Sequence, residues 1–129
     1  MIDIEEIKKN PDNQNWSNIS YNEVLSEGFI RKFQDKVNWI YISSKQKLSE
    51  EFIREFQDKV YWVYISYKQK LSEEFIREFQ NKVNWVYISR YQTLSDSFIK
   101  EFYDKIDFER LMNNPDISGE TKEFCRIFL

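Results

Sequence analysis

Apolar and polar residues alternate in a pattern that returns every 23 residues along the chain. The stretch Leu-Ser-Glu-Glu-Phe-Ile-Arg-Glu-Phe at residues 48–56 recurs at residues 71–79, and looser copies begin at Leu25 and Leu94. Large aromatic residues keep the same spacing, at Trp16, Trp39, Trp62, Trp85 and Phe108. A fixed period of this length is typical of tandem-repeat folds, in which each repeat buries its apolar face against its neighbours.

The first half of each repeat predicts an amphipathic helix, which we call the phenylalanine helix. In the repeat that begins at Leu48, Ser49 stands where a hydroxyl can cap the first free amides of a helix. Leu48 and Ile53 flank that cap as a hydrophobic staple. The apolar stripe that follows has helical spacing and consists of Phe52, Ile53, Phe56 and Val60. The pairs Glu50/Arg54 and Glu55/Lys59 have the i,i+4 spacing of favourable ion pairs within one helix.

The second half of each repeat predicts a shorter helix, the tryptophan helix, of about eight residues, too short to be stable alone. Its inward face carries Trp62, Ile65, Ser66 and Gln69 at i, i+3, i+4 and i+7. The recurring serine is small enough to let helices approach, and we expect the recurring glutamine to bond backbone at the turn. Caps are predicted at Asn38, Asn84 and Asp107, whereas Tyr61 breaks this pattern.

Weaker copies of the pattern occupy both ends of the chain. Asp3 and Glu6 have the spacing of a capping box for a helix that stops before Pro11, and a last helix is expected from about Gly119 onward. The predicted fold is therefore all-α, a short α-solenoid of tandem 23-residue helix-turn-helix repeats with degenerate terminal caps. We expect a single domain, 1–129, with an N-terminal cap at about 1–15, repeats at 16–114 and a C-terminal cap helix at 115–129.

Composition narrows the class of protein. Apolar residues make up 41% of the chain, enough for a folded core, and the net charge of −3 argues against a wholly acidic nucleic-acid mimic or a wholly basic coat. A single cysteine, Cys125, allows no disulfide within the chain and favours a reducing cytoplasmic location. No apolar run approaches a membrane span, and the acidic first six residues do not resemble a signal peptide.

Residues for catalysis are scarce. The chain has no histidine and only two glycines, which removes the commonest general base and any glycine-rich phosphate loop. The paired glutamates Glu50-Glu51 and Glu73-Glu74 fit solvated first helical turns. Cys125 aligns with the core position Phe102, which favours a small buried thiol. We therefore expect no enzyme, no cofactor, no metal and no small-molecule substrate.

Helical projection predicts two different outer surfaces. The phenylalanine helices present mainly acidic positions such as Glu51, Glu55 and Asp58. The tryptophan helices present tyrosines and cations, and the candidate partner-binding residues are Tyr41, Lys45, Tyr64, Tyr67, Lys68, Tyr87, Arg90 and Tyr91. This composition is typical of a protein interface and also of a single-strand nucleic-acid platform. A third reading places the tyrosines half-buried between stacked helices.

The motif Trp-x-x-Ile-Ser-x-x-Gln-x-Leu-Ser-Glu-x-Phe-Ile-Arg-Glu-Phe, clearest at residues 39–56 and 62–79, resembles a helical repeat of bacteriophage, giant-virus and AT-rich bacterial proteins. The first repeat departs from it at Asn18, Asn22 and Glu23. The resemblance implies a viral or mobile-element setting and no particular chemistry.

The leading hypothesis is a non-enzymatic protein-binding module. In a phage setting it would bind and occlude a host protein such as a defence nuclease, in the manner of an anti-CRISPR protein. Two alternatives stay open: a nucleic-acid-binding repeat protein that uses the tyrosine and lysine side chains, and a structural repeat protein that self-associates.

Overall fold

The computed structural model describes residues 2–128, which form α-helices and two short 3-10 helices and contain no β-strand. The contacts of the chain group into two compact units, Met1–Tyr61 and Trp62–Leu129. Met1 and Leu129, the outermost residues of the two predicted caps, lie outside the described residues.

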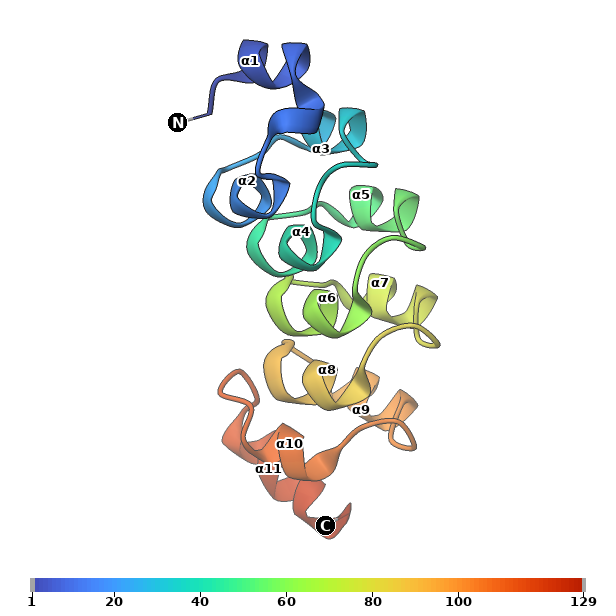
Figure 1. Cartoon of the computed structure of the whole chain (residues 1–129). Helices are drawn as coiled ribbons and strands as arrows, with labels where there is room; N and C mark the ends of the chain where they lie inside the picture. The colour runs from blue at the N-terminus through green and yellow to red at the C-terminus, as the bar shows by residue number, and fades with distance from the viewer. Residues whose placement is uncertain (1, 129) are drawn as a thin grey trace. The chain divides into compact units, whose positions relative to one another are not determined.

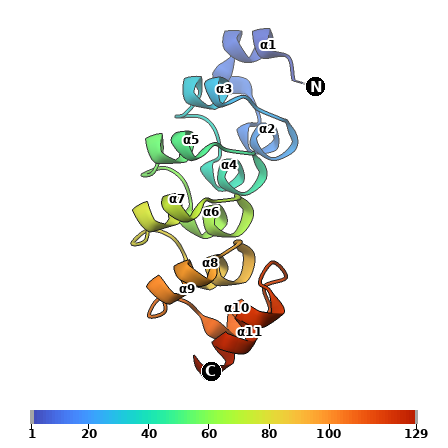
Figure 2. The ribbon, with the colours of Figure 1, turned by 180° about the vertical axis from the view of Figure 1, so that it is seen from behind.

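The first unit alternates between the two predicted kinds of helix. Its tryptophan helices α2 and α4 pack side by side, and α3 and α5 form a second layer beside them (Figures 1 and 2). The elements are α1 (Ile4–Lys9), the 3-10 helix η1 (Pro11–Asn13), α2 (Trp16–Asn22), α3 (Glu27–Lys32), α4 (Trp39–Lys45) and α5 (Glu50–Glu55).

The second unit continues the alternation. Helices α6, α8 and α10 pack in a row, and α10 also packs against α11. The elements are α6 (Trp62–Lys68), α7 (Glu73–Glu78), α8 (Trp85–Tyr91), α9 (Asp96–Glu101), α10 (Phe108–Met112), α11 (Gly119–Cys125) and the 3-10 helix η2 (Arg126–Phe128). The prediction of an all-α solenoid built from 23-residue helix-turn-helix repeats, with degenerate caps, is confirmed.

The phenylalanine helices are shorter than their apolar stripe. In α5 the Ser49 hydroxyl accepts from the amide of Phe52 as predicted, but the backbone leaves the helix at Phe56 (φ −107°, ψ 30°). Val60 stays buried because the amides of Lys59 and Val60 both donate to the Phe56 carbonyl in a tight turn. The stripe thus predicted the buried face correctly and overestimated the helix length.

Ending the helix early makes a carbonyl available to the next tryptophan. The indole Nε1 of Trp39 donates to the Gln34 carbonyl at 2.9 Å, in the turn that follows α3. The Trp39 ring then lies 6.2 Å from the ring of Phe52 and 5.2 Å from that of Phe56. Trp85 repeats this geometry in the second unit, where it packs on Phe98 and Phe102. These aromatic clusters join each tryptophan helix to the phenylalanine helix that follows it.

The recurring serines join successive repeats through hydrogen bonds. Ser66 is fully buried in α6, and its hydroxyl accepts from the amide of Asn84 at 2.9 Å while donating to the Trp62 carbonyl. Its counterpart Ser43 accepts from the amide of Tyr61. Since only a backbone amide is required at this position, a tyrosine can replace the usual asparagine there.

The recurring glutamines also bond backbone, as predicted, and they reach the preceding repeat. Gln92 donates from Nε2 to the carbonyls of Ser66 and Gln69, at 2.9 and 2.7 Å, and accepts from the Leu71 amide at 3.0 Å. Asn114 takes over part of this role in the last repeat, where its Nδ2 donates to the carbonyls of Ser89 and Gln92. Gln46 and Gln92 therefore each satisfy three backbone groups of the preceding repeat.

The predicted ion pair within the helix between Glu55 and Lys59 is wrong. Glu55 instead accepts hydrogen bonds from Arg31, 24 residues earlier on α3, and the two shortest measure 2.9 and 3.0 Å. Lys59 pairs with Asp35 at 3.2 Å. Adjacent repeats lie close enough for their charged side chains to pair with each other instead of with the next turn of their own helix. We call such an ion pair between successive repeats a rung.

The second unit has the same kind of rung, formed by Arg77 and Glu101 at 2.8 Å. The expectation of solvated glutamates in the first helical turn also fails for Glu73, because its carboxylate accepts from both the amide and the hydroxyl of Ser95. The charges of the phenylalanine helices therefore contribute to contacts between repeats.

Candidate protein-binding surface

Three of the candidate tyrosines meet in the second unit. Tyr87 and Tyr91 lie one turn apart on α8, and Tyr67 comes from α6 beside it. The Tyr67 ring stacks 4.4 Å from Tyr91 and 5.4 Å from Tyr87. Ile65, Ser66, Ile88 and Ser89 hold the opposite side of these helices in the core, so the tyrosines point outward.

Cations lie against these rings. The Lys68 ammonium is 4.3 Å from the centre of the Tyr67 ring, and the Arg90 guanidinium is 4.8 Å from that of Tyr91. Neither cation forms an ion pair with a carboxylate among residues 2–128. Together with Tyr87, these side chains form what we call the tyrosine face of the second unit.

The tyrosine face is hollowed at two places. A depression of about 360 Å³ lies between α6 and α8, and its rim includes Lys70, Thr93 and Asp116. A smaller one, of about 160 Å³, lies beside Tyr87 and is bounded by Arg110. Arg110 and Asp116 were not among the candidate residues. The repeat period could have found both, because they occupy the positions of Tyr87 and Thr93 one repeat later.

The stacking also changes the acidity of one phenol. Desolvation raises the pKa of Tyr91 above its ordinary value, and a hydrogen bond with Tyr67 and the charge that Tyr67 would carry raise it further. Arg90 acts in the opposite direction. The Tyr91 phenol is therefore uncharged at neutral pH.

The first unit has a smaller version of the same arrangement. Tyr41 on α4 meets Tyr21 on α2 edge-to-face, with ring centres 5.1 Å apart, and Lys45 lies 4.5 Å above the Tyr21 ring. Tyr21 was not among the candidate residues. Its position is equivalent to that of Tyr67, two repeats earlier, which is the signal that could have found it.

The candidate tyrosines differ in exposure. Tyr64 and Tyr91 are exposed, whereas Tyr41, Tyr67 and Tyr87 are half-buried. The reading in which tyrosines lie between stacked helices therefore holds for the last three, and they still form part of an accessible surface. Tyr64 lies on α6 apart from the stacked cluster.

Other chemistry is sparse in the described chain. Cys125 is buried, and burial raises the pKa of its thiol above the ordinary value. No group of three or more potential metal-ligating side chains occurs among residues 2–128. No helix in the same range is long and apolar enough to span a membrane.

The fold and this surface define a helical-repeat protein with an aromatic, cationic face. Comparison with known protein families, with curated proteins and with solved structures finds no match to the chain.

Proposed function

We propose that the chain is a non-enzymatic module that binds an acidic surface of another protein through its tyrosine face. The supporting observation is a contrast between two sets of charges. Arg31 and Arg77 on the phenylalanine helices are each neutralised by a glutamate of the next repeat. Lys68 and Arg90 form cation–π contacts with tyrosine rings and have no carboxylate partner among residues 2–128. Tyrosine and arginine are among the residue types that contribute most of the binding free energy in protein interfaces.

The stacking geometry favours an acidic protein over a nucleic acid. A single-strand platform binds because bases stack on free aromatic faces, each worth about 1–3 kcal/mol. Here Tyr67 already faces Tyr91, Tyr87 and the Lys68 ammonium, and Tyr91 faces Arg90. A base would have to displace these contacts, whereas carboxylates can reach the cations without disturbing the rings.

The biological setting has separate support. The resemblance of the repeat motif to phage, giant-virus and AT-rich bacterial repeats is the basis for the prediction that the partner is a host protein, such as a defence nuclease, which the module would occlude. The host partner and the alternative of self-association are both predictions from the sequence.

The test uses two anionic probes that each carry about twelve negative charges, a 12-residue polyglutamate and a 13-nucleotide oligothymidine without a terminal phosphate. We expect polyglutamate to bind the wild-type chain at low ionic strength, with an affinity that falls as salt is added. The variant Lys68→Glu, Arg90→Glu removes both cations of the tyrosine face, and it should lose this binding and keep its melting temperature. Both side chains project away from the buried face, so their replacement opens no cavity.

The matched control reverses Lys9 and Lys32, which changes the net charge equally but leaves the tyrosine face intact. This control should retain most of the polyglutamate affinity. Equal losses in both variants would mean that only net charge matters and would overturn the proposal. Oligothymidine that binds ten times more tightly than polyglutamate would establish the nucleic-acid reading instead.

A further inference from the structure

The last helix of the chain departs from the repeat pattern at three charged positions. In the preceding repeat Glu101, Asp104 and Lys105 occupy outward positions of the phenylalanine helix and the turn after it. The equivalent residues 23 positions later are Phe124, Ile127 and Phe128. Charged side chains have therefore been replaced by large apolar ones on the outer side.

The inner side of the same helix has changed in the opposite direction. The core positions Phe98, Ile99 and Phe102 of α9 become Thr121, Lys122 and Cys125 in α11. Thr121 and Cys125 remain buried, so the helix keeps its orientation. The largest apolar side chains of α11 and of the 3-10 helix η2 that follows it consequently face outward, with Phe124 39%, Ile127 73% and Phe128 43% exposed.

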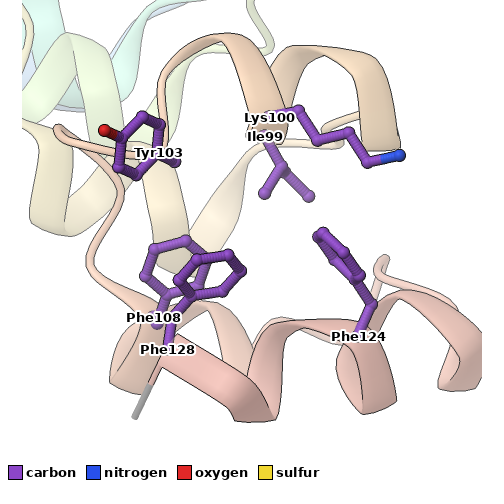
Figure 3. A pocket seen from close by; sticks show the side chains of 6 residues that line it. All are labelled: Ile99, Lys100, Tyr103, Phe108, Phe124 and Phe128. Atoms are coloured by element: carbon purple, nitrogen blue, oxygen red, sulfur yellow. The ribbon is translucent and has the colours of Figure 1, made fainter.

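Phe124 and Phe128 border a pocket of about 220 Å³ between α9 and α11. Figure 3 shows Ile99 pointing into it from α9 and Phe124 facing it from α11. The rings of Phe108 and Phe128 stack 4.8 Å apart to form one wall, and Tyr103 and Lys100 complete the lining. Lys100 is the only residue of this lining that carries a charge.

Lys100 stands at the position of the cation in a rung, but the position of the carboxylate holds an apolar residue. One repeat earlier, Arg77 binds Glu101, 24 residues further along the chain. The same spacing pairs Lys100 with Phe124, and the ammonium lies 5.2 Å from the centre of that ring. Lys100 forms no ion pair with a carboxylate among residues 2–128. The pocket therefore combines an apolar cavity with a cation at its rim.

We propose that this pocket binds a segment of another protein that inserts one aromatic or large aliphatic side chain and presents a neighbouring carboxylate to Lys100. An apolar cavity of about 150 Å³ accommodates benzene, so the space here is sufficient for one such side chain. The carboxylate of the ligand takes the place that Glu101 has on the preceding rung. This site is separate from the tyrosine face and does not depend on the function proposed for that face.

The probe is 3-phenylpropionate, which joins a phenyl ring to a carboxylate, and its uncharged counterpart is 3-phenylpropanamide. Titration of the ¹⁵N-labelled chain should shift the amide signals of Lys100, Tyr103 and Phe124. The variant Lys100→Gln should weaken 3-phenylpropionate binding a few-fold, in keeping with an exposed ion pair, and leave the amide probe unchanged.

The variant Phe124→Glu restores the residue type found at this position in the preceding repeat, and it should abolish the shifts caused by both probes. Its control is Val24→Glu, which introduces the same charge at a side chain that is 97% exposed elsewhere. The amide spectrum of Phe124→Glu reports whether α11 stays folded. If α11 unfolds in Phe124→Glu, the selective loss in Lys100→Gln still decides the question.

Three results would overturn the proposal. Shifts in the wild-type chain that avoid α9 and α11 would place the probe elsewhere. Equal weakening of both probes by Lys100→Gln would remove the role of the carboxylate. A wild-type chain that dimerises in sedimentation analysis, becomes monomeric in Phe124→Glu and binds neither probe would show that the pocket is a contact between two copies of this chain.

Discussion

The hydroxyl of Ser43 accepts a hydrogen bond of 2.9 Å from the backbone amide of Tyr61, 18 residues further along the chain. Ser43 is fully buried in α4, and Tyr61 is the residue just before α6. The same bond links Ser66 to Asn84 and Ser89 to Asp107 in the second unit. A buried serine thus satisfies the amide that precedes the tryptophan helix of the next repeat.

Replacement of Ser43 by alanine should lower the free energy of unfolding by about 1–3 kcal/mol, because the amide of Tyr61 loses its acceptor in a buried place. Urea denaturation measures this change. The control is Ser44→Ala on the neighbouring, less buried position of α4. Equal effects of the two substitutions would mean that Ser43 matters only for its small size.

Replacement of Tyr61 by asparagine should stabilise the chain by about 0.5–1 kcal/mol, through the gain of a helix N-cap. Asn38 and Asn84 supply this cap in neighbouring repeats, where their side chains accept from the amides of Tyr41 and Tyr87 at 3.2 Å. The measurement is again urea denaturation. A loss of stability would show that the Tyr61 ring, which is exposed, contributes more than the absent cap.

Replacement of Gln92 by leucine should be among the most costly polar substitutions, at about 3 kcal/mol or more, since it leaves several buried backbone groups without partners. Those groups are the carbonyls of Ser66 and Gln69 and the amide of Leu71. Gln34→Leu is the control, because Gln34 makes one exposed bond to the Arg31 carbonyl and should cost less than about 0.5 kcal/mol. Similar costs for both variants would contradict the role assigned to Gln92.

The helices, their caps and their buried faces could be predicted from the sequence because those signals are local. A serine three residues before a phenylalanine predicts a helix cap, and the spacing of Ile65 and Gln69 predicts one face of a helix. Both signals lie within one or two helical turns. Partners in a neighbouring repeat are different, because their identity depends on the distance between helices. Glu55 stands four residues before Lys59 and 24 after Arg31, and only the structure shows that Arg31 binds it.

The candidate surface was predictable to a similar extent. Helical projection indicated that Tyr67, Tyr87 and Tyr91 point outward, but their mutual stacking depends on how closely α6 and α8 pack. The exposed apolar residues of α11 and η2 were missed for another reason. The repeat register predicts which face of a helix is inward, and in this last segment the largest apolar residues do not follow that register.

The charged rung between Arg77 and Glu101 should make stability depend on pH in a defined direction. The hydrogen bond from Arg77 is the main cause that lowers the pKa of Glu101 below its ordinary value, and desolvation opposes it. A lowered pKa in the folded state stabilises the chain above the unfolded pKa, and this contribution is lost as the pH falls through the folded value.

Glu101→Gln should therefore be less stable than the wild-type chain at pH 7, and the difference should shrink as the solution is acidified below the ordinary pKa of glutamate. Thermal melts between pH 7 and pH 2 measure it. Glu120→Gln, at an exposed residue of α11, provides the comparison. A difference between wild type and Glu101→Gln that stays constant over this range would show that the rung does not discriminate between the two protonation states.

The buried bonds between repeats have a consequence for how such a chain can evolve. Gln92 and Ser66 each join their neighbour by bonding to peptide groups, and apart from the amide that proline lacks every amino acid supplies these groups. Mutations on the outer positions can then accumulate without disturbing the assembly of the repeats, as the tyrosine at position 61 illustrates. The chemical character of the exterior can therefore change by substitution while the hydrogen bonds between repeats stay the same.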